Sequence, residues 1–318
     1  MSIEAILSRS DGNDEPVDLA SWTPHQIPRD ELLWVDLVAP TGDELATLRR
    51  ALGLQDDAIE SLGEDPGAPS AAVRSDAVDL VVQAPGERLD DEPRNLRILI
   101  GAEWIVTCHP EPLRFLEGHR RAIQDQREVG RLTPVEFLVS ILDWHVDAFF
   151  AAAEALEEEV DDLDDAALRT EDDLLRRLVG MRRRIAGVRR MLSPHREVYA
   201  ELARPDFLAG IEDRERDALH AVAARLDRAA DAIVNAREML IGTFDVHMTR
   251  TAQRTNDVMK VLTLASVVLL PAVVLAGVMG MNFRVGFFED PNTFWVVIGV
   301  MVALAIGTVV AVRWRGWL

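Results

Sequence analysis

The sequence has 318 residues, with 34 Lys or Arg against 54 Asp or Glu, and its formal net charge is −20. This balance argues against nucleic acid as a partner, because no basic face of domain size is available to neutralise phosphates. The single cysteine, Cys108, excludes a disulfide framework and fits a reducing cytosol.

Residues 1–130 alternate short apolar runs with polar turns, which predicts a cytosolic α/β domain. The expected strands are Ile3–Leu7, Leu32–Val38, Val78–Gln83, Leu96–Ile100 and Trp104–Cys108. The last two flank Gly101-Ala102-Glu103 and are expected to form a hairpin. Thr41 or Asp43 is expected to cap a helix that runs to Leu52. The first ten residues lack a basic segment followed by an apolar one, so no signal peptide is predicted.

Residues 131–210 are expected to form an antiparallel pair of helices, one acidic and one basic. The first is dense in carboxylates between Glu154 and Asp165, and the second, from about Glu171 to Leu202, is rich in arginine. Opposite charges predict ion pairs between the two helices. Metal storage is the weaker interpretation, since exposed charge runs are usually solvated and would hold hydrated divalent ions only weakly.

From about Asp213 the chain has no proline before Pro271, which predicts one long helix. We assign its cytosolic stalk to residues 211–260, its pore-lining transmembrane part to 261–280, an extracytoplasmic loop with Gly-Met-Asn to 281–292, a second transmembrane helix to 293–312 and a basic cytosolic tail to 313–318. The charge-free runs that contain the two spans, residues 261–283 and 291–312, each exceed the roughly 20 residues that cross a bilayer.

Basic residues set the expected orientation in the cell membrane. Arg250, Arg254 and Lys260 precede the first span, and Arg313 and Arg315 follow the second. The positive-inside rule therefore predicts a multi-pass membrane protein with both termini in the cytoplasm.

A seam of mostly small or polar residues follows the long helix at alternating steps of three and four. It consists of Asp231, Asn235, Glu238, Gly242, Asp245, Thr249, Ala252, Asn256, Met259, Thr263, Ser266, Leu270, Val273 and Gly277. Apolar neighbours such as Val258, Leu262, Leu269 and Val274 are expected to pack adjacent helices. By periodicity alone, a water-filled path through an oligomer and small-residue packing of membrane helices are equally favoured.

Three segments carry a resemblance to a known family. They are the block Asn256–Thr263, the end of the first span with Gly277–Phe283, and the tail Arg313–Leu318. With Pro271 between the first two, the chain resembles the CorA-type divalent-cation channels of the two-transmembrane Gly-Met-Asn superfamily. The resemblance is specific over about residues 230–318, and over 1–230 it rests on domain order.

The resemblance implies a funnel-shaped homopentamer of α+β/α type that passively conducts hydrated Mg²⁺, and also Co²⁺ or Ni²⁺. Gly280, Met281 and Asn282 would form the outer entrance, with Asn282 contacting the metal through its hydration shell. The remaining implied pore residues are the constriction Met259 and Leu262, the polar ring Asn256, the lining Thr263, Ser266, Leu270, Val273 and Gly277, and the carboxylate ring Asp245, a second metal contact. No cofactor is expected, Mg²⁺ being the substrate and a candidate regulator.

The sequence departs from the family pattern at several places. Met279 stands where a tyrosine is common, Val273 replaces a hydroxyl residue, and the outer loop lacks Met-Pro-Glu-Leu. In the stalk, Ala221 and Ala224 replace two aspartates, the first of which helps to bind regulatory cytosolic Mg²⁺ in the family. We therefore expect closure by cytosolic Mg²⁺ to be weak.

Two alternatives stay open at the level of sequence. One is a Zn²⁺ transporter of the same superfamily, with proton coupling, which is usually marked by Gly-Ile-Asn. The other is a membrane-anchored cytosolic scaffold or sensor without transport. An enzyme is not expected, because neither a Walker motif nor a catalytic constellation of side chains rises above chance.

Overall fold

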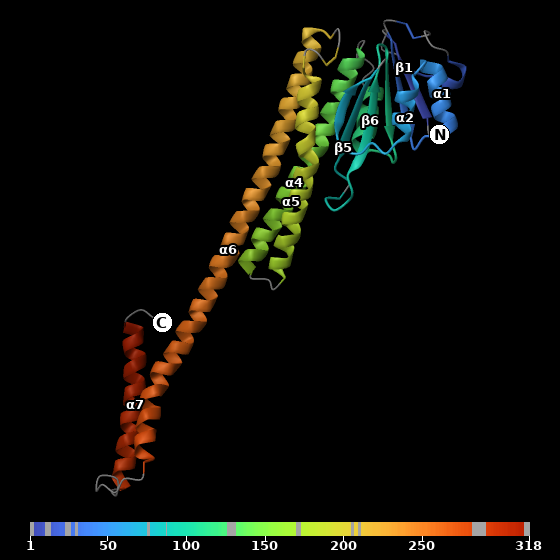
Figure 1. The fold of residues 1–318 in the computed structure, drawn as a ribbon. Helices are drawn as coiled ribbons and strands as arrows, with labels where there is room; N and C mark the ends of the chain where they lie inside the picture. Colours follow the sequence, from blue (N-terminus) through green and yellow to red (C-terminus); the bar gives the residue numbers. More distant parts are fainter. Residues whose placement is uncertain are drawn as a thin grey trace. The chain divides into compact units, whose positions relative to one another are not determined.

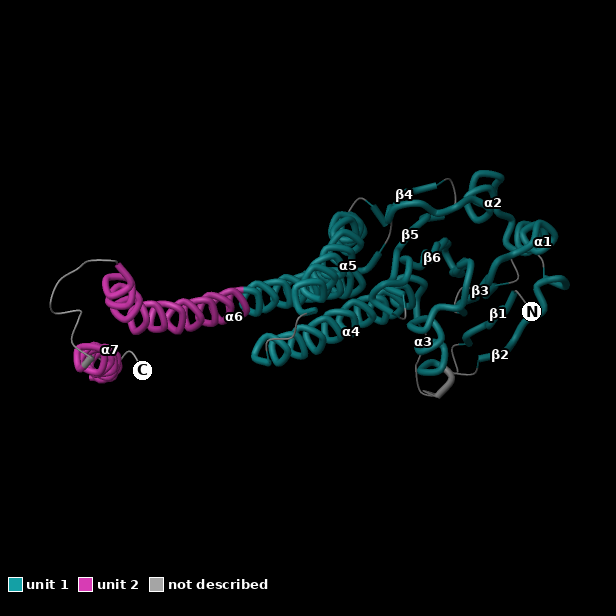
Figure 2. Tube along the Cα trace, turned by 90° about the horizontal axis from the view of Figure 1, so that it is seen from below, with its two compact units in different colours: residues 1–244 teal, residues 245–318 magenta. Residues whose placement is uncertain are grey.

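A computed structural model describes residues 3–9, 14–22, 27–28, 31–74, 77–86, 88–125, 132–169, 173–204, 207–208, 211–281 and 291–314. The chain divides into two compact units, residues 1–244 and residues 245–318 (Figure 2). The boundary falls inside a helix, within the segment predicted as the stalk.

The described part of unit 1 contains a mixed sheet with the strand order β2-β1-β3-β7-β6-β5-β4 (Figure 1). Its strands are β1 (Ile3–Ser8), β2 (Asp14–Pro16), β3 (Leu32–Val38), β4 (Ser70–Val73), β5 (Val78–Ala84), β6 (Arg94–Ile100) and β7 (Trp104–His109). Strands β3 and β7 run parallel, and the other neighbouring strands run antiparallel. The helices are η1 (Leu19–Ser21), α1 (Gly42–Leu52), α2 (Asp56–Gly63), α3 (Arg114–Asp125), α4 (Pro134–Arg169), α5 (Leu174–Leu202), α6 (Asp213–Met279) and α7 (Pro291–Trp314).

Each face of the sheet has its own apolar core, because successive side chains of a strand point to opposite sides. On β3, Leu32 and Trp34 join a core that also contains residues of α3, α4 and α5. The alternating residues Leu33, Val35 and Leu37 join a second core with α1 and α2. Helices therefore cover both faces of the sheet, and each fully buried leucine contributes about 1.5–3 kcal/mol by its removal from water.

The local signals read from the sequence form the elements that they predict. The five predicted strands match β1, β3, β5, β6 and β7 to within one or two residues, and β6 and β7 form the predicted hairpin. Thr41 caps α1 in a capping box with Glu44, and Gly53 ends the helix in the left-handed conformation. Strands β2 and β4 were not predicted, since both are short edge strands with mostly exposed side chains.

Helices α4, α5 and the first part of α6 share one apolar core with the sheet. Leu156 of α4, Ile185 of α5 and Leu226 of α6 all belong to it. The predicted ion pairing between the acidic and basic helices is represented by Glu159 and Arg184, whose Oε1 and Nη1 lie 2.7 Å apart. This pair lies at the rim of the contact, because buried charges cost more free energy than buried leucines, and the buried side chains between α4 and α5 are uncharged.

Unit 2 contains the second part of α6 and helix α7. Both helices include a stretch long and apolar enough to cross a membrane, with mean hydropathies of 2.6 and 2.5. Large apolar side chains are exposed on both, including Leu270 at 63% and Trp295 at 72%. An apolar surface of this kind is stable only against lipid or against other protein.

Candidate functional site: the uncovered face of α6

In unit 2, one side of α6 is covered. Between residues 261 and 280 the partly buried positions recur every three or four residues and comprise Leu264, Val268, Pro271, Ala272, Leu275 and Met279. The covered positions of α7 have the same spacing and comprise Thr293, Val297, Met301, Ala305 and Thr308. Two helices packed along their lengths produce one such stripe each. Helix α7 therefore packs on this side of α6.

The predicted seam lies on the other side of α6. At about 100° per residue, its members from Asn256 to Gly277 are centred opposite the stripe that α7 covers. All of them are exposed, with Met259 at 55%, Leu270 at 63% and Val273 at 67%. The residues of the candidate pore wall thus share one face, and the described part of unit 2 leaves that face uncovered.

The same relation holds in unit 1. There α6 buries Leu226, Ile233 and Leu240 against its own core. The seam residues of this part, which are Asp231, Asn235, Glu238 and Gly242, are exposed on the opposite side of the helix. In each unit, taken by itself, the seam is the face of α6 that the subunit does not use for its own packing.

Hydroxyl groups on the seam donate their protons to backbone carbonyl oxygens of the same helix. Ser266 Oγ donates to the Leu262 carbonyl oxygen at 2.9 Å, and Thr249 Oγ1 donates to that of Asp245 at 2.8 Å. Each oxygen is left with lone pairs that accept hydrogen bonds from outside. Waters bound to a divalent cation are donors, so these groups suit a hydrated ion rather than a bare one.

The carboxylate of Asp245 is exposed on the seam. Among the described residues, no group of three or more His, Cys, Asp or Glu side chains is arranged to hold a metal ion. A site at Asp245 would therefore need carboxylates from several copies of the chain, and its role as a metal contact stays a prediction.

The predicted entrance is described only at its start. Helix α6 ends at Met279, and Gly280 N and Met281 N donate to the carbonyl oxygens of Ala276 and Val278 at 2.9 and 3.2 Å. A Cβ atom at Gly280 would lie 3.3 Å from the Ala276 oxygen, which favours glycine there. Asn282 lies outside the described residues, so its position is not part of the geometry.

Two buried histidines, His145 of α4 and His195 of α5, form hydrogen bonds with the backbone of Gln83 near the end of strand β5. Gln83 N donates to His195 Nε2 at 2.8 Å, and the Gln83 carbonyl oxygen lies 3.0 Å from His145 Nε2. His145 Nδ1 lies 2.7 Å from Tyr199 Oη. Burial lowers the pKa of His145 to about 3 and that of His195 to about 4. Both rings are therefore neutral near pH 7 and serve the fold. Their spacing in the sequence did not predict that they are in contact.

A second polar cluster surrounds Asp36 of β3, between the sheet and helix α3. Its Oδ1 lies 3.1 Å from His109 Nε2, and Arg120 binds its Oδ2. Burial acts to raise the pKa of Asp36, but the hydrogen bond and charge of His109, with Thr107 and Arg120, hold the pKa below its ordinary value. Both carboxylate oxygens of Asp36 are bound within the fold, so the cluster stabilises the link between β3, β7 and α3.

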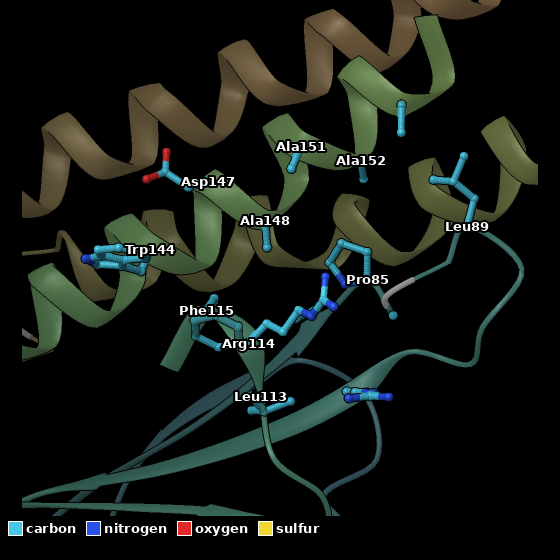
Figure 3. A pocket seen from close by; sticks show the side chains of 14 residues that line it. Pro85, Leu89, Leu113, Arg114, Phe115, Trp144, Asp147, Ala148, Ala151 and Ala152 are labelled. Carbon is cyan, nitrogen blue, oxygen red and sulfur yellow. The ribbon is translucent and has the colours of Figure 1, made fainter. Parts of the chain in front are cut away.

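A pocket of about 320 Å³ opens in unit 1 beside α4 (Figure 3). Its wall is mostly apolar, with Ala148, Ala151 and Phe115 among the lining residues. Asp147 at its edge is paired with Arg225, with 2.6 Å between Oδ1 and Nη2. The acid of this pocket is therefore committed to an ion pair, and we assign the pocket no chemistry.

Comparison with known proteins identifies the family. The sequence profile described as CorA-like Mg2+ transporter protein matches residues 29–313. The cobalt/magnesium transport protein CorA of Thermotoga maritima is 30% identical over 204 residues, which are 63% of this chain and 57% of that protein. Its counterpart in Methanocaldococcus jannaschii is 23% identical over 299 residues, covering 90% of this chain and 92% of that protein. The chain belongs to the CorA family of divalent-cation transporters, which are membrane proteins.

Solved structures share the fold. The complete structure of the CorA magnesium transporter from M. jannaschii covers 99% of this chain and 98% of its own, with a TM-score of 0.83 at 22% identity. Full-length CmaX gives a TM-score of 0.74 over 98% of this chain and 96% of its own at 19% identity. The cytoplasmic domain of ZntB from Vibrio parahaemolyticus gives 0.64 over 80% and 100% at 12% identity. The predicted soluble domain, long helix and two apolar C-terminal helices are confirmed.

Proposed function

We propose that this protein is a homopentameric channel through which hydrated Mg²⁺, and also Co²⁺ or Ni²⁺, enters the cytoplasm passively. The single observation that carries the proposal is the uncovered seam of α6. The subunit packs α7 on one side of this helix and leaves the polar and small residues exposed on the other. Copies arranged around an axis with their seams inward would enclose a polar path.

Apolar rows beside the seam support a ring. In unit 2, Leu269 flanks the seam on one side at 60% exposure, and Val267 and Val274 flank it on the other at 46% and 56%. In a two- or three-stranded coiled coil the apolar residues occupy the seam itself. A helix in a larger ring has neighbours at a wider angle, so its contact rows move outward and the seam faces a lumen.

The chemistry of the seam suits a hydrated ion. Mg²⁺ dehydrates reluctantly, so a pathway works best if it contacts the water shell through oxygen acceptors. Ser266 and Thr249 offer such acceptors, and Asn282 would add amide oxygens at the entrance. Rings of Met259 and Leu262 would gate the path by dewetting, and an inside-negative potential would drive entry with about 2.3 kcal/mol per charge per 100 mV.

Uptake by proteoliposomes loaded with a Mg²⁺-sensitive dye tests the proposal. We expect Asn282→Ala to reduce uptake to background, because the ring of amides that receives the water shell is lost. The oligomer should persist, as measured by chemical cross-linking of the same vesicles. Asn292→Ala is the matched control, since it makes the same change at an exposed residue of α7 and should leave uptake unchanged. Wild-type flux through Asn282→Ala would exclude the entrance role.

Zinc is the second candidate substrate. Two observations support Zn²⁺ as an alternative substrate: the similarity to the ZntB cytoplasmic domain and the absence of Met-Pro-Glu-Leu from the outer loop. The same vesicles, assayed with Mg²⁺ and with Zn²⁺ in the presence and absence of a proton gradient, separate the two. Proton-coupled Zn²⁺ flux without Mg²⁺ flux would overturn the proposed substrate. A scaffold without transport would show neither flux.

A further inference from the structure

An apolar groove of about 280 Å³ lies in unit 1 between the first turns of α5 and residues 237–244 of α6. Leu175 and Val179 of α5 line it at 54% and 45% exposure, and Ile241 and Phe244 of α6 at 46% and 40%. Two arginines, Arg182 and Arg237, complete its wall. Nothing in the described part of this chain fills the groove, although its apolar lining favours an occupant.

The groove lies on one flank of α6, and α4 lies on the other. The ion pair between Arg196 of α5 and Asp227 of α6, with 2.7 Å between Nε and Oδ1, ties α5 to the first flank. Arg225 of α6 binds Asp143 and Asp147 of α4 on the second flank. The seam runs between these flanks, on the face that the subunit leaves uncovered.

The flank beside α4 is acidic. Asp143 and Asp147 begin a row on one face of α4 that continues at helical spacing through Glu154, Glu158, Asp161 and Asp165, all four of which are exposed. On the same flank, α6 exposes the apolar side chain of Met239 at 37%. The second flank therefore offers an apolar residue bordered by carboxylates, which complements a groove bordered by guanidinium groups.

The two complementary flanks lie at the same height along α6. Contacts of Thr133, directly before α4, and of Asp143 and Asp147 with α6 join residues 82 or 78 positions apart, so the two helices run in the same direction. Continued along both helices, this offset puts Glu158 and Asp161 level with the part of α6 that carries Met239 and Ile241. A rotation about an axis parallel to α6, without translation, would bring the groove of one copy onto the acidic flank of the next.

We propose that the α5–α6 groove is a docking surface for a second copy of this chain. It receives the α6 flank around Met239, while Arg182 and Arg237 face the acidic row of the neighbour's α4. Because the two surfaces differ, the contact is head-to-tail, and it closes into a ring rather than into a two-fold dimer. The inference rests on the proposed ring of subunits and identifies the cytosolic surface that forms it.

Disulfide trapping in the full-length protein in membranes tests this contact. The native thiol does not compete, because Cys108 is buried and burial raises its pKa to about 11. We expect oxidation of the Met239→Cys/Ile241→Cys double variant to give a ladder of bands up to the complete ring. The two positions lie on opposite flanks of one helix, so they cannot pair within a chain. Each single variant should stay monomeric on the gel.

Dimers formed by either single variant would overturn the head-to-tail contact in favour of a two-fold one. Absence of the ladder, with normal Mg²⁺ uptake in the same vesicles, would overturn this docking surface and leave the proposed function intact.

Charge reversal tests the ion pairing itself, because a variant that only damages the fold would not be rescued by a second charge reversal. In the double-cysteine background, Arg182→Glu should remove most of the ladder, and adding Glu158→Arg should restore it, because each chain carries both halves of the contact. Arg190→Glu is the control, since Arg190 is exposed on the same helix but does not line the groove. A ladder unaffected by Arg182→Glu would contradict the charge pairing.

Discussion

The two compact units of this protein differ in where their large apolar side chains lie. In unit 1 most large apolar side chains lie inside, with Leu33, Leu156 and Phe149 fully buried, and most charged residues lie at the surface. In unit 2, Leu270, Val273 and Trp295 are more than half exposed. Helix α6 passes through both, so one helix is built for two environments. The seam is the feature that stays the same in both, which is why we assign it the function.

Truncation of a leucine in each unit tests this contrast most strongly. Leu156→Ala removes a side chain with 0% exposure and should lower the free energy of unfolding by about 2–5 kcal/mol, because a cavity replaces packed atoms. Leu270→Ala changes an exposed seam residue, so we expect less than about 0.5 kcal/mol of destabilisation and faster Mg²⁺ uptake through a wider path. Denaturant unfolding and dye uptake measure the two effects. A loss of stability in Leu270→Ala equal to that in Leu156→Ala would mean that the seam is packed.

The polar cluster around Asp36 gives the next effect in size. Arg120→Ala should destabilise unit 1 by about 2–3 kcal/mol, because it leaves the buried Asp36 carboxylate with His109 and Thr107 alone. Arg121→Ala is the matched control, since the side chain of Arg121 is 77% exposed and pairs within its own helix. Denaturant unfolding of both variants is the measurement, and equal stability of the two would contradict the role of Arg120.

The buried histidines predict an acid-labile unit 1. Their pKa values in the folded state, about 3 for His145 and about 4 for His195, lie below the value of about 6.5 in an unfolded chain. The unfolded state therefore binds more protons below pH 6.5, and stability is lost as the pH falls. Between pH 7.5 and 5.5 we expect a loss of roughly 1 kcal/mol for each histidine.

Denaturant unfolding at the two pH values measures this loss. His220→Gln, at an exposed position of α6, should leave the pH dependence unchanged. Stability that is equal at pH 7.5 and 5.5 would contradict the neutral state of the two buried rings.

The smallest expected effect concerns regulation. Because Ala221 and Ala224 replace the stalk aspartates, millimolar Mg²⁺ on the cytosolic side should slow uptake only slightly. Ala221 is exposed, so Ala221→Asp should fold normally and increase the inhibition, whereas the uncharged Ala221→Asn should not. Tight closure of the unmodified protein in that range would show that other carboxylates bind the regulatory ion.

The sequence by itself determined the elements whose signals are local. Alternating apolar residues in Leu32–Val38 and the capping box at Thr41 each act within a few residues, and both appear in the structure as predicted. The membrane segments and the seam were equally accessible, because length, hydropathy and helical spacing depend on the chain alone. The family followed from motifs in the last third.

Only the tertiary structure decided which surfaces meet. The contact of His145 with His195, the edge strands β2 and β4, and the groove between α5 and α6 all join residues that no local spacing connects. The structure also showed that α7 covers the side of α6 opposite the seam. Periodicity identifies a face of a helix but not its occupant, because that depends on the free energy of packing against residues distant in sequence.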